Sequence, residues 1–221
     1  WTPELFNFFT NKGVSVNQID QNGTTALMVA ASGSKENLEN IFSISKNSSH
    51  QDQSGKSAIT IAIERGKKEN FDFLLSKGAD LKIKDTLGND LMYSAFNSYN
   101  SNKKQVTQHF INQLRLAGFH GKKTYKNENT LAHIAIEKQS IFLLEKAIEM
   151  GANINSKNNI NLSPLHLAAM KATNKELIDV LLKNGAEKNT LTEFNESPYD
   201  LALQNELLNK GNIDLAFLKI N

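Results

Sequence analysis

The sequence contains six copies of one short pattern, and this internal repetition limits the possible folds more than any other feature. Each copy starts with a hydroxyl or acidic residue, continues with a short apolar run and reaches an alanine at its sixth position. These marker alanines are Ala30, Ala62, Ala95, Ala135, Ala168 and Ala202. Their spacings are 32, 33, 40, 33 and 34 residues. A period near 33 residues indicates a stacked repeat protein rather than a fold with one central core.

A glycine that follows an apolar run provides a second marker. In all five cases, the distance from this glycine to the next marker alanine is 17 residues. The marker glycines are Gly13, Gly78, Gly118, Gly151 and Gly185. The long spacing of 40 arises between Ala95 and Gly118, where the polar stretch 97–104 lengthens the repeat. We expect this stretch to form a longer first helix and loop. The alternative is that it makes a specific contact at the edge of the repeats opposite the turn tips.

Each copy predicts two helices joined by a tight loop. Pro3, Pro164 and Pro198 each follow Thr or Ser. This order marks a helix start, because the hydroxyl caps a backbone N–H and proline has no N–H to leave unpaired. The glycine is a typical helix stop, followed by an extended turn. Neither helix can bury its apolar side alone, so successive repeats must stack.

The residues around the markers resemble one family. The period, the segment Ser-Pro-Leu-His at 163–166 and the Gly-Ala pair at 185–186 are similar to ankyrin repeats. The resemblance extends from Gly13 to about Leu218. It implies an all-α solenoid of stacked helix-turn-helix repeats with extended β-turn tips. We expect a single domain over 1–221, with an N-terminal orphan helix and turn (1–17), five full repeats (18–189) and a C-terminal capping repeat (190–221).

The sequence disfavours catalysis. It has no cysteine, which excludes a disulfide framework, a thiolate metal site and a cysteine nucleophile. His133 and His166 occupy the position where the family's histidine bonds to backbone and to the capping hydroxyl. Phosphate-binding glycine loops and nucleophile-elbow motifs are missing. We therefore expect a protein that is not an enzyme and has no cofactor, no metal and no small-molecule substrate.

Net charge and hydropathy limit the classes of partner that this chain could bind. The net charge is +2, from 25 Lys and Arg against 23 Asp and Glu. A Lys-rich turn around Tyr125 could contact phosphates, but arginine is scarce, so a solvated turn is favoured over nucleic-acid binding. No apolar run approaches the ~18 residues of a membrane span.

We expect a monomer. Because the chain begins in mid-repeat at Trp1 and lacks cysteine, we favour an exported or periplasmic location, with the cytoplasm as the alternative.

The resemblance implies that a protein partner binds the turn tips and the concave face of the first helices. The early tips are polar, with residues such as Asn22 and Ser54, whereas the later tips carry large apolar residues. Apolar residues at tips expected to face water suggest an interaction surface. The alternative is that neighbouring tips bury one another. The predicted partner-binding residues are Leu87, Tyr125, Lys126, Glu137, Lys138, Ile160, Leu162, Met170, Lys171 and Phe194.

The resulting functional hypothesis is a non-catalytic protein-interaction module of unknown partner. The alternative is a regulatory or targeting ankyrin region of a larger enzyme or toxin whose catalytic part lies outside this chain. Fold alone does not distinguish the two.

Overall fold

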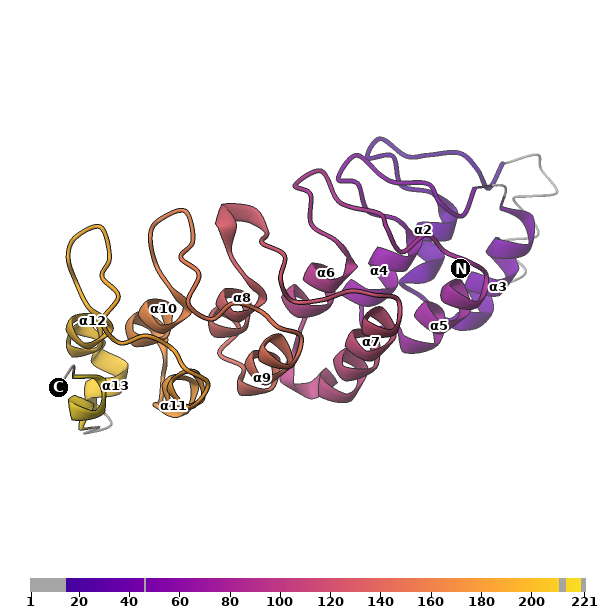
Figure 1. Cartoon of the computed structure of the whole chain (residues 1–221). Helices are drawn as coiled ribbons and strands as arrows, with labels where there is room; N and C mark the ends of the chain where they lie inside the picture. The colour runs from indigo at the N-terminus through magenta and orange to yellow at the C-terminus, as the bar shows by residue number, and fades with distance from the viewer. Residues whose placement is uncertain (1–14, 46, 211–213, 220–221) are drawn as a thin grey trace. The chain divides into compact units, whose positions relative to one another are not determined.

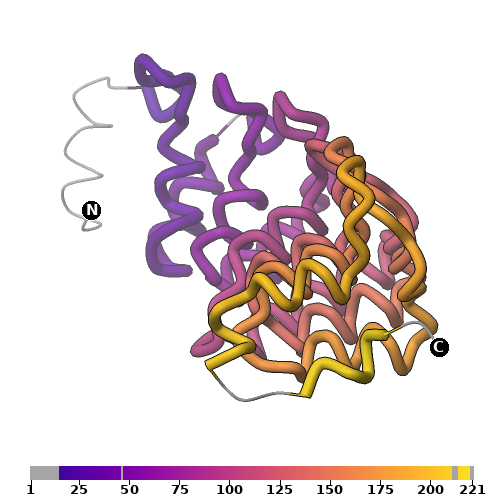
Figure 2. The backbone as a smooth tube through the Cα atoms, turned by 90° about the vertical axis from the view of Figure 1, so that its left-hand side faces the viewer, coloured from indigo at the N-terminus to yellow at the C-terminus, as the bar shows by residue number. Residues whose placement is uncertain are grey.

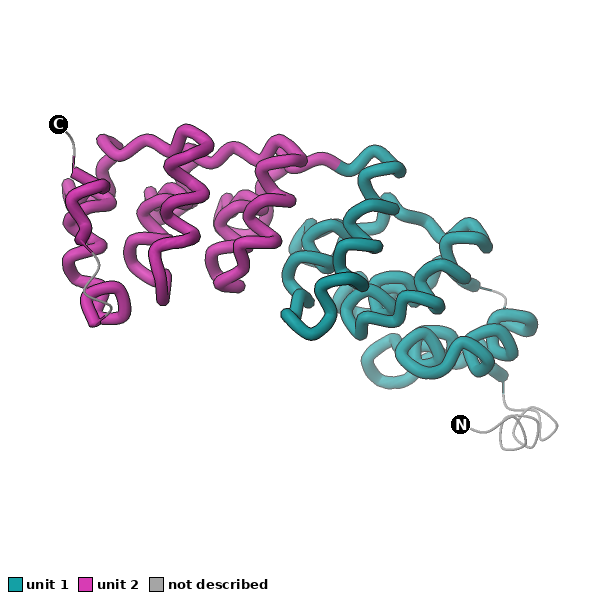
Figure 3. Tube along the Cα trace, turned by 90° about the horizontal axis from the view of Figure 1, so that it is seen from below, with its two compact units in different colours: residues 1–119 teal, residues 120–221 magenta. Residues whose placement is uncertain are grey.

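The structure, a computed structural model, describes residues 15–45, 47–210 and 214–219. These residues are mainly helical, and their β pairing is an isolated antiparallel bridge between Ile19 and Thr25. The predicted all-α class is confirmed. The chain divides into two compact units, unit 1 (residues 1–119) and unit 2 (residues 120–221), shown in Figure 3. The single domain over 1–221 stays a prediction. The predicted orphan helix, which precedes Gly13, lies outside the described residues.

Unit 1 contains three helix pairs, each a first helix followed by a second helix. The pairs are α2 (Ala26–Ala31) with α3 (Lys35–Ile44), α4 (Ala58–Glu64) with α5 (Lys68–Ser76), and α6 (Leu91–Asn97) with α7 (Lys104–Leu116). The 3₁₀ helix η1 (Ser101–Lys103) precedes α7. First helices pack on first helices and second helices on second helices, α2 on α4, α4 on α6, α3 on α5 and α5 on α7. The extended tips project from one end of the first helices (Figures 1 and 2).

Unit 2 repeats this arrangement. Its pairs are α8 (Leu131–Glu137) with α9 (Ile141–Glu149), α10 (Pro164–Lys171) with α11 (Glu176–Lys183), and α12 (Pro198–Gln204) with α13 (Glu206–Lys210). The 3₁₀ helices are η2 (Lys126–Glu128) and η3 (Leu215–Leu218). The first helices α8, α10 and α12 form one row, and α9 packs on α11 in the other. At the C-terminal end η3 packs on α12 and buries Leu215 and Leu218.

The first helices begin where the sequence predicts. Ser163 and Ser197 cap α10 and α12, with Pro164 and Pro198 in the first turn. Asp90 replaces the hydroxyl at the start of α6, and its carboxylate accepts the Tyr93 N–H at 3.1 Å. All three side chains satisfy an N–H that the helix itself leaves unpaired.

The marker alanines are buried in the first helices, which pack on one another within each unit. All six, Ala30, Ala62, Ala95, Ala135, Ala168 and Ala202, are among the buried residues. A small side chain at this position lets the helices of adjacent repeats approach closely, and this requirement explains why alanine recurs once per repeat.

The polar stretch 97–104 does not lengthen the first helix of its repeat, so that expectation is wrong. Helix α6 ends at Asn97, and the additional residues form η1 and a second helix of 13 residues, α7. The ammonium group of Lys103 donates a hydrogen bond to the Arg65 carbonyl oxygen at 3.1 Å. The stretch therefore contacts the loop between the two helices of the preceding repeat.

Candidate partner-binding surface

Five of the tips, all except the one that begins at Tyr125, are built around one polar side chain that accepts two backbone N–H groups. In unit 1, Oδ1 of Asp52 accepts from Ser54 at 2.8 Å and from Lys56 at 3.0 Å. Asn158 and the hydroxyl of Thr192 accept the corresponding bonds in unit 2. Aspartate, asparagine and threonine therefore produce the same tight turn.

This turn exposes the residue two positions after the acceptor. That residue is Leu87 after Asp85, Ile160 after Asn158 and Phe194 after Thr192. The exposed fractions of these side chains are 60%, 59% and 82%. The idea that neighbouring tips bury these three side chains is therefore wrong.

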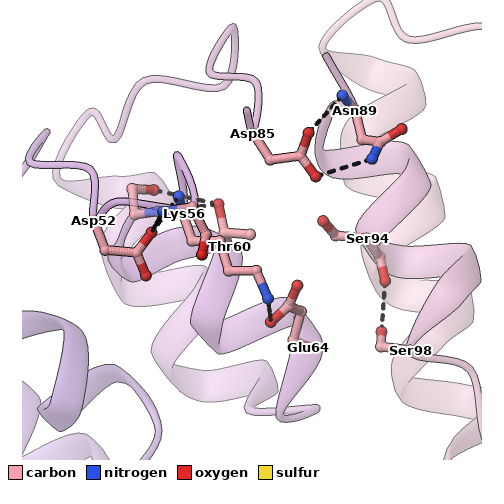
Figure 4. A network of polar contacts seen from close by, with 10 residues as sticks. Asp52, Lys56, Thr60, Glu64, Asp85, Asn89, Ser94 and Ser98 are labelled. Atoms are coloured by element: carbon pink, nitrogen blue, oxygen red, sulfur yellow. Dashed lines mark hydrogen bonds and ion pairs between the residues drawn. The ribbon is translucent and has the colours of Figure 1, made fainter. Parts of the chain in front are cut away.

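In unit 1, polar side chains line the space between the tips and the first helices (Figure 4). Lys56 pairs with Glu64 of α4 at 2.9 Å, and Nδ2 of Asn89 donates to Oδ2 of Asp85 at 2.9 Å. On α6, the Ser98 hydroxyl donates to the Ser94 carbonyl oxygen. These side chains bond to one another within the unit, and Oδ1 of Asn89 is the one buried side-chain oxygen among the described residues that has no hydrogen-bond partner.

In unit 2, the corresponding space is a depression of about 260 Å³. It lies between the tips preceding α8 and α10 and the ends of these two helices. Five of the predicted residues line it: Glu137, Ile160, Leu162, Met170 and Lys171. Met170, at the end of α10, is 41% exposed. The sequence prediction and the depression thus coincide at these residues.

An ion pair forms one border of the depression. Nζ of Lys171 lies 2.8 Å from Oε1 and 2.9 Å from Oε2 of Glu137. This pair connects α10 with α8, 34 residues earlier in the chain. Both side chains are nearly half exposed, so the pair contributes little to stability.

Two predicted anchors are buried, and their assignment as exposed contacts is wrong. Tyr125 is 8% exposed, because it starts a tip whose backbone closes on Asn129 and because the Lys123 ammonium lies 4.9 Å from its ring centroid. Leu162 is also 8% exposed, and it forms part of the inner wall of the depression.

The remaining predicted residues do not all come together. Lys126 is exposed and Lys138 is half-buried at the end of α8. Phe194 stands on the following tip and does not line the depression. Leu87 belongs to unit 1 and is not part of the surface in unit 2.

A pair of amides at the depression was not predicted from the sequence. Nδ2 of Asn158 donates to Oδ1 of Asn129 at 3.0 Å and so joins two successive tips. The many asparagines in these tips are evident from the sequence. Which of them pair across 29 residues depends on how the repeats stack. Asn159 also bonds across the tips, from its N–H to the Asn127 carbonyl oxygen at 2.9 Å.

His133 and His166 are fully buried and bridge backbone groups. Burial lowers the pKa of both rings, against opposing backbone hydrogen bonds at Leu162 and Thr190. Within the described ranges, no group of three His, Asp or Glu side chains is arranged to hold a metal ion. The same part of the chain has no helix long and apolar enough to cross a membrane.

Comparison with known proteins agrees with this architecture. A family model describing three copies of the ankyrin repeat matches residues 2–85 and 91–192. Among solved structures, the human ASB11 ankyrin repeat domain has a TM-score of 0.76 at 19% identity and covers 97% of this chain and 92% of that one. A complex of the predatory endopeptidase Bd0816 from Bdellovibrio bacteriovorus with the immunity protein Bd3460 matches with a TM-score of 0.70. The identity is 22%, over 91% of this chain and 97% of the matched chain.

Curated relatives share the repeats at low identity. An ankyrin repeat protein of fowlpox virus is 24% identical over 155 residues, covering 66% of this chain and 43% of the viral protein. Mouse Rabankyrin-5 is 28% identical over 181 residues, covering 80% of this chain and 15% of Rabankyrin-5. The chain therefore spans less than half the length of these relatives. Ankyrin repeats are generally non-catalytic and bind proteins. On the family match, the capped helix pairs and the bridging histidines, the chain belongs to the ankyrin-repeat family.

Proposed function

We propose that this chain is a protein-interaction module and that its partner binds unit 2 at the depression between the tips and α8 and α10. The observation that carries the proposal is the exposure of Ile160 and Met170 in one depression beside the Lys171–Glu137 ion pair. Apolar anchors within a polar rim are the usual anatomy of a protein interface. A solved structural neighbour is itself a complex of two proteins, which supports a protein as the partner class.

The test is affinity capture from the source organism on immobilised wild-type chain and on an Ile160→Asp/Met170→Asp double variant. We expect the variant to lose the captured partner, because each substitution places a charge where an apolar contact is needed. The control is Ile44→Asp/Leu116→Asp. It adds the same charge at exposed apolar residues near the ends of the second helices α3 and α7. Equal capture by wild type and the Ile160/Met170 variant would contradict the proposal.

A further inference from the structure

The positive charge of unit 2 is concentrated around the depression. The segments 120–138 and 152–171 form its two tips and first helices, and they contain only Glu128 and Glu137 as acidic residues. They contain six lysines, Lys122, Lys123, Lys126, Lys138, Lys157 and Lys171. The rest of unit 2 has six lysines against ten Asp and Glu. The whole unit is neutral, so this uneven distribution creates a local positive field.

Three of these lysines, Lys126, Lys138 and Lys157, form no ion pair with a described carboxylate. Glu137 is already paired with Lys171. Among the described residues, neither Lys126 nor Lys138 has a carboxylate partner, and Lys157 donates to the Leu191 carbonyl oxygen instead. Lys126 and Lys138 directly adjoin the lining residues Asn127 and Glu137 in sequence, and both are suited to receive carboxylates from outside.

The depression also offers donors and apolar surface. Asn129 uses its Oδ1 to accept from Asn158, so its amide NH₂ group remains to donate to a ligand. Ile160 and Met170 are exposed, and Leu167, which is buried, completes the apolar lining. Methionine adapts its shape to the group packed against it.

We propose that the depression binds an acidic, extended peptide segment of the partner protein. One large apolar side chain of that segment lies between Ile160 and Met170. Its flanking carboxylates approach Lys126 and Lys138, and its backbone carbonyl oxygens accept from the amide of Asn129. The inference rests on the proposed function and specifies the partner's chemistry.

The same lysines could attract a nucleic acid, but other features of the site disfavour it. Single-stranded nucleic acids need aromatic side chains on which bases stack. Of the residue types Phe, Tyr and Trp, the two segments contain only Tyr125, which is buried with the Lys123 ammonium over its ring. The two segments contain no arginine, and exposed Ile160 and Met170 suit an apolar side chain.

The experiment selects phage-displayed random peptides of about 12 residues on the full chain. We expect the selected peptides to carry an excess of Asp and Glu around one Leu, Ile, Phe or Met. A Lys126→Glu/Lys138→Glu variant should fail to enrich them. The control, Lys175→Glu/Lys183→Glu at the two ends of α11, makes the same charge change at exposed lysines that do not line the depression and should select the peptides as the wild type does. Circular dichroism verifies that all variants are folded.

One selected peptide is then measured by fluorescence anisotropy beside its Asp→Asn/Glu→Gln counterpart. We expect the neutral counterpart to bind about tenfold more weakly. The affinity of the acidic peptide should fall as NaCl rises from about 50 to about 300 mM. A fluorescent single-stranded RNA of similar length is the competing probe, and tighter binding of this RNA would overturn the proposal.

Three other outcomes overturn it: no enrichment of any peptide, enrichment without an acidic excess, or equal affinity of the neutral counterpart. These outcomes are distinct from failure of the proposed function. If capture of the natural partner still depends on Ile160 and Met170, the surface is correct and only the acidic chemistry is wrong. If the wild type and the Ile160/Met170 variant capture the partner equally, the proposed binding surface is wrong.

Discussion

Nε2 of His133 lies 2.9 Å from the carbonyl oxygen of Leu162, so the ring of one repeat bonds to the tip of the next. Its Nδ1 accepts the Thr130 backbone N–H at 3.1 Å, so the proton is on Nε2 and the ring is neutral. His166 makes the same bridge to Thr190 at 3.1 Å. Because Leu162 lines the depression, the His133 bridge also positions the proposed binding surface.

The first prediction is a loss of stability below about pH 6.5. Burial lowers the pKa of His133 and His166 from the ordinary value of 6.5. As pH falls below 6.5 the unfolded chain takes up protons that the folded chain does not, so the free energy of unfolding falls. Urea denaturation between pH 8 and pH 5 measures it. A His133→Gln/His166→Gln variant should show a smaller decrease over this range, and an unchanged slope would contradict the assignment.

The second prediction compares two glycines of unit 1 that share the same backbone conformation. Gly55 has φ +77° and Gly88 has φ +79°. A Cβ at Gly55 would lie 2.7 Å from the Cα atom of Asp85 in the next tip, whereas a Cβ at Gly88 meets nothing within 4 Å. Gly88→Ala should cost about 1–2 kcal/mol for the left-handed conformation alone. Gly55→Ala should cost more, because the next tip must also move.

Thermal unfolding of both variants, followed by circular dichroism, measures this difference. Equal losses of stability for the two variants would show that moving one tip away from the next costs no free energy. They would also show that the hydrogen bond between these tips, from the Thr86 N–H to the Ser54 carbonyl oxygen at 3.0 Å, does not contribute to stability.

The third prediction concerns Asn205, a buried asparagine between α12 and α13. Its Nδ2 donates to the carbonyl oxygens of Ala169 and Ala172 at 2.9 and 3.0 Å, and its Oδ1 accepts from Leu207 and Leu208. Asn205→Ala should cost about 1–3 kcal/mol, because it leaves buried carbonyl groups without a donor. The control Asn209→Ala changes a solvent-exposed asparagine of α13 and should cost less. Equal urea midpoints for the two variants would contradict this role.

These residues show how far the sequence alone predicts the structure. Caps such as Ser163 and the marker alanines were predictable, because a helix start and a close helix contact each impose a local requirement. The burial of Tyr125 and Leu162 was not predictable, because it depends on how one tip folds against its neighbours. The double role of Asn205 was missed for the same reason, since its acceptors lie 33 and 36 residues away.

The fourth prediction tests the register of the repeats in unit 2. Ala135 is fully buried in α8, so Ala135→Leu should overpack the contact between first helices and cost about 1–3 kcal/mol. Glu145→Leu, at an exposed position of α9, is the control and should be close to neutral. An unchanged melting temperature for Ala135→Leu would mean that the marker alanines do not lie between the helices.

The last prediction ranks the exposed apolar residues of unit 2 as binding contacts. Phe194 is larger and more exposed than Ile160, so exposure alone would rank Phe194 first. Energetically important contacts, however, lie in places from which a partner excludes water, and Ile160 borders the depression while Phe194 does not. Ile160→Ala should therefore weaken binding of the captured partner by about 2 kcal/mol, and Phe194→Ala by less than about 1 kcal/mol. Isothermal titration calorimetry measures both, and the opposite order would move the binding site to the tip before α12.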